Sequence, residues 1–186
     1  FWNARGLGVR AKRAFIFNAA RRLKVSVLAI HEPKQACDRI TGFGKHLGFF
    51  HAMYDSSCSN SIWVFWKWES EGEKDEASSQ HIMTNVKMGC YEIFISIVYE
   101  SNVVSVRKDL WWSLGCFNTG ISAWVVAGEL NTIAEFREKR GGLEYSREYI
   151  QEFNKFMAST GLVDLRFSGS CFTWCNNRKG NSQIWI

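Results

Sequence analysis

Alternation of apolar and polar residues predicts the strands of this chain. The clearest strand spans residues 91–99, where apolar side chains fill every second position and polar ones fall between them. The same alternation predicts a strand within 61–68, and short apolar runs predict buried strands at 25–30 and 123–127. The strongly polar stretch 67–80 is predicted to be an exposed loop between two apolar runs.

A period of three to four residues predicts the helices. Apolar positions spaced in this way indicate a basic helix from about 9 to 23, a second helix through 110–117 and a third through 150–157. Gly161 is expected to end the third helix as a C-terminal cap. Because strands and helices alternate along the chain, we predict an α/β fold with helix-covered sheets, in a single domain over residues 1–186.

The composition excludes two classes of protein. With 46% hydrophobic and 22% charged residues, the chain is too apolar for wholesale disorder. No apolar run approaches the ~18 residues that a membrane span needs, so we expect no membrane partner. A secretory signal pattern is also missing, which favours a nuclear or cytoplasmic protein that is not secreted.

The cysteines do not have the spacing of a metal site. The six cysteines form no C-x-x-C pair, and the four histidines do not supply a matching set. Without a secretory signal, reduced thiols are favoured over disulfides. We therefore expect no zinc and no disulfide framework.

Positive charge is concentrated at the start of the chain. The net charge is +5, from 23 basic and 18 acidic side chains, and residues 1–31 contain seven basic residues and no carboxylate. These are Arg5, Arg10, Lys12, Arg13, Arg21, Arg22 and Lys24. A solvated helix face and a phosphate-binding patch both fit this cluster, because clustered Lys and Arg supply the sequence-independent part of nucleic-acid affinity.

Polar residues directly follow three predicted strands, in the segments 31–34, 99–102 and 128–131. Because a rigid sheet positions the side chains at its strand ends, three such segments together favour a site over three unrelated turns. The carboxylate of Glu32 and the amide oxygen of Asn3 are hard ligands of the kind that Mg²⁺ prefers. No P-loop and no G-x-S-x-G motif is present. The remaining candidates are metal-assisted hydrolysis of a phosphoester and a binding module on a similar scaffold.

Five short motifs together carry a family resemblance. In chain order they are Trp2–Gly8, Glu32–Lys34, Val98–Tyr99, Gly128–Asn131 and Phe172–Trp174. The chain resembles the endonuclease/exonuclease/phosphatase superfamily, and more narrowly the apurinic/apyrimidinic-type endonuclease domain of plant LINE-type (non-LTR) retrotransposons. The resemblance implies a four-layered α/β sandwich, in which two β-sheets pack face to face with helices outside.

The resemblance also implies roles for individual residues. Asn3 and Glu32 match the family's metal-site positions for Mg²⁺, with Mn²⁺ as an alternative. Tyr99 matches a tyrosine that contacts the scissile phosphate, and Asn131 matches an asparagine that holds this phosphate and the attacking water. Glu129 stands where the family has the Asp that orients or deprotonates that water. We therefore expect Asn3 to lie near Glu32, and Tyr99, Glu129 and Asn131 to converge on one cleft.

The implied partner is DNA, bound through its phosphate backbone. Arg5, Arg10, Lys12 and Arg13 are the candidate nucleic-acid-binding residues, because they form the first part of the basic cluster and neighbour the first motif. The implied function is that of a Mg²⁺-dependent DNA endonuclease domain of a retroelement. The oligomeric state does not follow from the sequence.

Two departures from the family pattern bear on activity. The family's Gly-Asp-Phe-Asn motif reads Gly128-Glu129-Leu130-Asn131 here, and a misplacement near 1 Å of a reacting group costs on the order of 10²-fold in rate. The family also continues past the position of Ile186 into Arg-Leu-Asp-Arg and Ser-Asp-His segments, whose Asp and His complete its site. We therefore expect a fold that misses its final strands, and a 186-residue chain that does not cleave DNA measurably.

Two alternatives stay open. One is a non-catalytic nucleic-acid-binding remnant that keeps the basic helix. The other is a superfamily phosphatase acting on a small phosphoester, such as an inositol phosphate. The retroelement-type segments 5–8 and 172–174 argue against the phosphatase.

Overall fold

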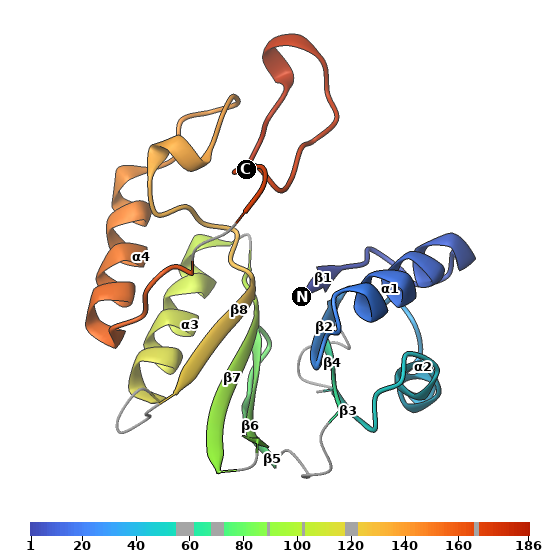
Figure 1. Cartoon of the computed structure of the whole chain (residues 1–186). Coiled ribbons are helices and arrows are strands. Elements are labelled where there is room, and N and C mark those ends of the chain that lie inside the picture. The colour runs from blue at the N-terminus through green and yellow to red at the C-terminus, as the bar shows by residue number, and fades with distance from the viewer. Residues whose placement is uncertain (55–61, 68–72, 89, 102, 118–122, 166–167) are drawn as a thin grey trace. The chain divides into compact units, whose positions relative to one another are not determined.

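The computed structural model of the chain describes residues 1–54, 62–67, 73–88, 90–101, 103–117, 123–165 and 168–186 (Figure 1). The chain divides into two compact units. The first comprises residues 1–101 and 120–129, and the second comprises 102–119 and 130–186.

The first sheet of the first unit orders its strands β1-β2-β4-β3. Strands β1, β2, β4 and β3 span Trp2–Asn3, Val27–His31, Ile62–Trp66 and His51–Tyr54. Strand β1 runs parallel to β2, whereas β4 is antiparallel to both β2 and β3. The parallel pair places the carboxyl ends of β1 and β2 side by side.

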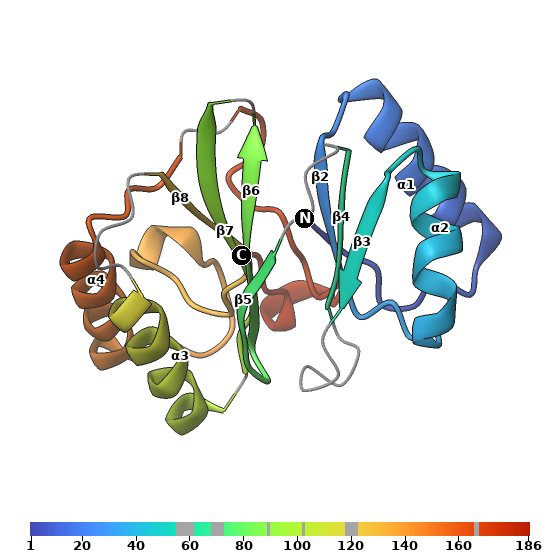
Figure 2. The same cartoon turned by 90° about the horizontal axis from the view of Figure 1, so that it is seen from below.

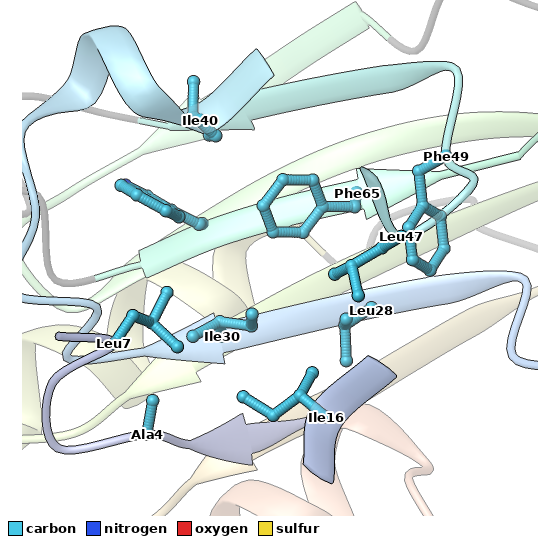
Figure 3. Packing of buried hydrophobic residues seen from close by; sticks show 10 residues of the cluster. Ala4, Leu7, Ile16, Leu28, Ile30, Ile40, Leu47, Phe49 and Phe65 are labelled. Carbon is cyan, nitrogen blue, oxygen red and sulfur yellow. The ribbon is translucent and has the colours of Figure 1, made fainter. Parts of the chain in front are cut away.

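Helices α1 (Arg10–Arg22) and α2 (Ile40–His46) belong to the same unit and share a core with the first sheet (Figure 3). Ile16 of α1 and Ile40 of α2 are buried with sheet residues such as Phe65. Gly44 permits the close approach of α2, because a Cβ at this position would lie 2.8 Å from Cδ1 of Phe65.

The second sheet orders its strands β5-β6-β7-β8. These span Glu73–Ala77, His81–Met88, Tyr91–Tyr99 and Trp124–Glu129. Strands β7 and β8 are parallel, and the other neighbours are antiparallel. Side chains of the two sheets form one buried cluster, made of Ala29, Ile62, Val64, Trp66, Ile82 and Ile97. The sheets therefore pack face to face (Figure 2).

In the second unit, helices α3 (Val104–Phe117) and α4 (Arg147–Thr160) pack through aromatic rings. The Trp111 ring centroid lies 5.2 Å from that of Phe153 and 4.8 Å from that of Phe156. Short 3₁₀ turns span Cys37–Arg39 in the first unit, and Phe136–Glu138 and Gly180–Ser182 in the second.

Most of the predicted elements are present. The strand at Tyr91–Tyr99 is confirmed to the residue, and Gly161 caps α4 in a left-handed conformation, with φ 70°. The predicted helices correspond to α1, α3 and α4, although α3 begins earlier than expected, at Val104. The α/β class with two face-to-face sheets is confirmed.

One prediction was wrong. Part of the polar stretch 67–80, expected to be a loop, forms strand β5 at Glu73–Ala77. This strand pairs with β6 on one side and lies at the sheet edge, where charged residues are tolerated because only one side of the backbone is paired. Residues 68–72 of the predicted loop lie outside the described residues.

Two expectations concern cysteines and membranes. The described cysteines, at positions 37, 90, 116, 171 and 175, are free thiols. Within the described ranges, no helix is long and apolar enough to cross a bilayer.

Candidate active site

The candidate site of the first unit lies where strands from both sheets end. Parallel pairing of β1 with β2 sets Asn3 beside His31, directly before Glu32. Parallel pairing of β7 with β8 sets Tyr99 beside Glu129. The carboxyl ends of these parallel strands carry the polar side chains, which is where α/β folds place functional groups.

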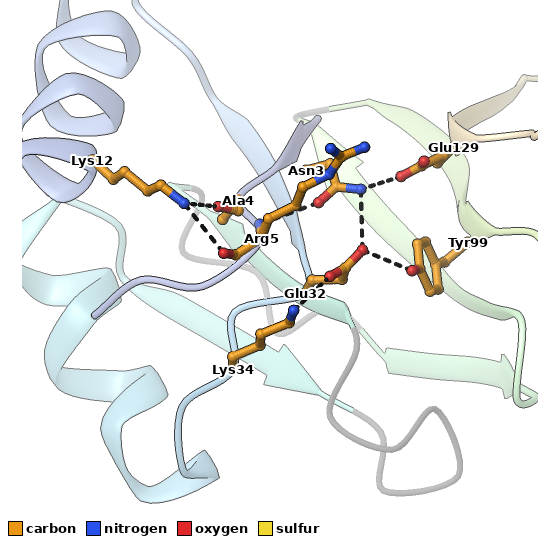
Figure 4. Close-up of polar contacts among 8 residues, drawn as sticks. All are labelled: Asn3, Ala4, Arg5, Lys12, Glu32, Lys34, Tyr99 and Glu129. Atoms are coloured by element: carbon orange, nitrogen blue, oxygen red, sulfur yellow. Dashed lines mark hydrogen bonds and ion pairs between the residues drawn. The ribbon is translucent and has the colours of Figure 1, made fainter. Parts of the chain in front are cut away.

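The side chain of Asn3 joins two carboxylates (Figure 4). Its Nδ2 donates to Oε1 of Glu32 at 3.4 Å and also donates to Oε2 of Glu129. Oε1 of Glu32 accepts a second hydrogen bond from the Tyr99 hydroxyl at 2.9 Å. The expected proximity of Asn3 to Glu32 and the convergence of Tyr99 with Glu129 are therefore confirmed.

The orientation of the Asn3 amide follows from its other contact. Its Oδ1 accepts the backbone N–H of Arg5 at 3.2 Å, which leaves Nδ2 to face the carboxylates. In this arrangement Asn3 presents a donor to Glu32 and Glu129. Its role as an oxygen ligand of a metal stays a prediction.

Unusual backbone conformations cluster around these residues. Arg5, Glu32 and Lys34 have φ values of 45°, 46° and 49°, a left-handed region that non-glycine residues rarely adopt. Gly128 is required for a different reason, because a Cβ there would lie 1.8 Å from the carbonyl oxygen of Val98. Strained or crowded backbone of this kind persists where the surrounding structure holds functional groups in place.

The pKa values of Glu32 and Tyr99 both depart from their ordinary values. Partial burial raises the pKa of Glu32, but hydrogen bonds from Tyr99, Lys34 and Asn3, with the Lys34 charge, bring that pKa below its ordinary value. Burial, the hydrogen bond to Glu32 and the charges of Glu32 and Glu129 raise the pKa of Tyr99 to about 12. Glu32 is thus ionised at neutral pH, and Tyr99 remains a hydrogen-bond donor.

Lys34 belongs to this network, although it was not among the predicted site residues. Its Nζ lies 3.2 Å from Oε2 of Glu32. The sequence signal was present, because Lys34 completes the Glu-Pro-Lys motif. The ion pair is solvent-exposed on the lysine side, so it contributes little to stability but offsets the Glu32 charge.

His31 lies directly behind the site. Its ring is buried, with its centroid 5.2 Å from that of Tyr99. Neither ring nitrogen has a hydrogen-bond partner within the described part of the chain. Burial, then the positive chain N-terminus, lower its pKa to about 4, although Glu32 opposes the shift, so His31 is neutral at physiological pH.

The donor set fits a hard divalent cation. Mg²⁺ is commonly bound by one or two carboxylates with water completing its coordination, and Glu32 and Glu129 supply two carboxylates held on one amide. In the described ranges, no group of three or more His, Cys, Asp and Glu side chains gathers as a metal site.

The remaining predicted residues lie elsewhere or make other contacts. Asn131 belongs to the second unit, where its backbone carbonyl accepts the Tyr145 hydroxyl at 3.0 Å; its place in the cleft stays a prediction. Lys12 and Arg13 donate to backbone carbonyls of the loop after β1. Arg5 adjoins the site, since its charge partly opposes the rise in the pKa of Tyr99. Contacts of Arg5, Arg10, Lys12 and Arg13 with DNA stay predictions.

Comparisons with known proteins bear on the fold. No protein-family model matches the chain, and no curated protein matches it by sequence. The endonuclease domain of TRAS1, a telomere-specific non-LTR retrotransposon, is similar, with a TM-score of 0.68 at 9% identity over 100% of this chain and 82% of that one.

Two further solved structures are similar. An AP endonuclease from Archaeoglobus fulgidus matches with a TM-score of 0.64 at 12% identity, over 84% of this chain and 68% of that one. The human Nocturnin catalytic domain matches with a TM-score of 0.53 at 14% identity, over 95% of this chain and 75% of that one.

At this level of identity the likeness establishes the fold alone. The chain has the α/β fold of the endonuclease/exonuclease/phosphatase proteins, a fold of nucleases and phosphodiesterases that includes a retrotransposon endonuclease. The predicted fold class is therefore confirmed.

Proposed function

We propose that this chain is a degenerate Mg²⁺-dependent phosphodiesterase (DNA endonuclease) domain of a retroelement. The observation that carries the proposal is the pairing of Glu32 with Glu129 on the Asn3 amide, beside the Tyr99 hydroxyl. Two carboxylates gathered around one donor at the ends of parallel strands are ligands that a divalent cation prefers, and a bound cation would attract a phosphate oxygen. Mn²⁺ is the alternative ion, and the plant LINE assignment rests on the sequence motifs.

Each side chain has a distinct role in this proposal. Glu32 would hold the ion, which when bound neutralises charge on a phosphate oxygen. Tyr99, kept protonated by its raised pKa, would turn its hydroxyl from Glu32 to donate to a phosphate oxygen when the substrate binds. Glu129 accepts a proton from the attacking water, and Asn3 sets the separation of the two carboxylates.

We also propose that the 186-residue chain does not nick DNA measurably. Glu129 replaces the shorter Asp of the family motif, so its carboxylate reaches further than that chemistry requires. His31, which packs against the Tyr99 ring, is neutral with a pKa of about 4 and cannot act as an imidazolium. Loss of one positioned acid–base group typically costs ~10²–10⁴-fold in rate.

The test compares Mg²⁺ binding, nicking of supercoiled plasmid and DNA binding in the wild type and in Glu32→Gln. We expect the wild type to bind Mg²⁺ and DNA without nicking, and Glu32→Gln to lose Mg²⁺ affinity by at least about tenfold. Glu135→Gln is the matched control, because Glu135 is exposed in the second unit and pairs with Arg137 there. A wild type that binds no Mg²⁺ contradicts the metal site.

Three other outcomes decide the rest. Mg²⁺-dependent nicking that Glu32→Gln abolishes contradicts the proposed inactivity and supports the endonuclease. DNA binding without any Mg²⁺ binding identifies the non-catalytic remnant. Hydrolysis of an inositol phosphate, with DNA left intact, identifies a phosphatase.

A further inference from the structure

The first turn of α1 carries positive charge, which is unfavourable at a helix N-terminus. The free N–H groups of a helix N-terminus favour carboxylates, yet this turn contains no acidic residue and carries Lys12 and Arg13. Cations at this position are retained when another contact compensates for the unfavourable dipole.

That contact is the loop between β1 and α1. Nζ of Lys12 donates to the carbonyl oxygens of Ala4 and Arg5, at 3.0 and 3.2 Å. Arg13 donates through one guanidinium nitrogen to the carbonyls of Leu7 and Gly8, at 2.6 and 2.9 Å. The two cations therefore donate to four carbonyls of the loop that follows β1 (Figure 4 shows the Lys12 bonds).

The opposite side of the same loop is paired with the segment that follows β2. The N–H of Ala4 donates to His31 at 2.9 Å, and the N–H of Gly6 donates to the carbonyl of Glu32 at 2.8 Å. Ala4 and Leu7 also insert their side chains into the core. The loop is thus held by its N–H groups on one side and by α1 on the other.

One peptide plane links Lys12 to the candidate site. The carbonyl of Ala4 and the N–H of Arg5 belong to the same planar unit. Lys12 binds the oxygen of this unit, and Oδ1 of Asn3 accepts its N–H at 3.2 Å. A rotation of that plane would turn the Asn3 amide away from the carboxylates, and Arg5, at φ 45°, does not hold the plane by its own preference.

We propose that Lys12 is a positioning residue that fixes the Asn3 amide between Glu32 and Glu129, and that it is not a phosphate contact. The metal-binding part of this inference rests on the proposed function. The positioning part does not, because it concerns contacts within the chain itself. Two of the three N–H donors of the ammonium are directed at carbonyls, which orients the group along the loop.

The test uses Lys12→Met, which removes the ammonium and keeps the side-chain length. Lys24→Met is the matched control, since it removes the same charge from an exposed position just after α1. We expect Lys12→Met to shift the NMR signals of the Asn3 side-chain amide and to speed exchange of the Gly6 and Leu7 amides about tenfold. It should also weaken Mg²⁺ binding about tenfold, whereas Lys24→Met changes none of these.

Two further measurements distinguish a loss of the Lys12 contacts from misfolding of the variant. Lys12→Arg keeps a cationic donor and should restore much of the Asn3 signal. In the wild type, the Lys12 ammonium protons should exchange more slowly with water than those of Lys24, because they are hydrogen-bonded. Equal exchange of the two ammonium groups overturns the proposal.

The alternative role gives a different pattern. If Lys12 contacts phosphate, Lys12→Met lowers the salt slope of DNA binding by about one unit beyond the Lys24→Met control and leaves the Asn3 signals unchanged. That result overturns the positioning role. A wild type that binds no Mg²⁺ refutes the proposed function, while the Asn3 and ammonium signals still decide the role of Lys12.

Discussion

At the scale of single residues, one amide organises the candidate site. Asn3 contacts Glu32 and Glu129 with one nitrogen and accepts the Arg5 N–H with its oxygen. Because an amide group has both donor and acceptor, it can join two carboxylates to a backbone turn, which a carboxylate at this position could not do. Two negative groups are thereby held together before any cation binds.

Tyr99→Phe tests the hydrogen bond that stabilises the Glu32 carboxylate. Removing the hydroxyl deletes a donor to Oε1, so the pKa of Glu32 should rise toward its ordinary value. The titration of the Glu32 carboxyl, followed by carbon NMR, measures the change. Tyr149→Phe in the second unit is the control, and an unmoved Glu32 pKa in Tyr99→Phe contradicts the contact.

The lowered pKa of His31 predicts that the folded state loses stability in mild acid. Its folded pKa of about 4 lies below the unfolded value of 6.5, so the unfolded state binds more protons between these values. The contribution is present above pH 6.5 and is lost as pH falls towards 4, by about 2 kcal/mol between pH 7 and pH 5. Urea unfolding at the two pH values measures it.

His31→Leu should remove that part of the pH dependence, because leucine does not titrate. His46→Leu, at an exposed position on α2, is the matched control and should keep the wild-type pH dependence. An identical loss of stability in acid for His31→Leu and the wild type would falsify the buried neutral state of His31.

At the scale of elements, the pairing of β7 with β8 brings Tyr99 to Glu129. The two strands are parallel and adjacent, with Tyr99 in register with Glu129 and Val98 in register with Gly128. Position 128 lies so close to the backbone of β7 that a side chain does not fit. The glycine of the Gly128-Glu129-Leu130-Asn131 motif therefore serves strand pairing, and the residue after it carries the carboxylate.

Gly128→Ala should separate β8 from β7 and displace Glu129. The added Cβ would meet the Val98 carbonyl oxygen at 1.8 Å, and such a clash typically costs more than about 2 kcal/mol. Thermal unfolding measures the destabilisation. Gly115→Ala is the control, because a Cβ there meets nothing within 4 Å and alanine favours the α3 helix. Equal stability of the two variants contradicts the close pairing.

At the scale of the whole molecule, the excess of basic residues determines how the chain interacts with polyanions. The net charge of +5 arises from 23 basic and 18 acidic residues, and the first 31 positions carry no carboxylate. Such a distribution attracts a phosphate backbone at long range without reading its sequence. It is consistent with the proposed DNA partner and independent of catalysis.

DNA binding should weaken steeply with salt and hardly vary with DNA sequence. The logarithm of the binding constant should fall linearly with the logarithm of salt concentration, because bound phosphates release counterions. Fluorescence anisotropy with short duplexes between about 50 and 200 mM salt measures the slope. Binding that is insensitive to salt contradicts the electrostatic interface.

The elements that could be predicted from the sequence are those whose signal is local. The alternation at Tyr91–Tyr99 and the cap at Gly161 could be predicted because each depends on residues a few positions apart. The same holds for the polar residues after the strands, including Glu32 and Glu129. Strand β1 is too short to show a periodic pattern of apolar residues. Strand β5 could not be recognised because its charged residues resemble a loop, although an edge strand tolerates them.

The contacts between these strand ends depend on strand pairing and could not be predicted from local patterns. Asn3 contacts residues 29 and 126 positions away, and no periodicity reports which strand ends become neighbours. Motif order suggested that Asn3 and Glu32 are close, but the amide orientation and the two-carboxylate contact follow from strand pairing and from the Arg5 turn. Lys12 shows the same limit: its charge predicts a phosphate contact, and only the structure shows that its ammonium donates to the backbone carbonyls of Ala4 and Arg5.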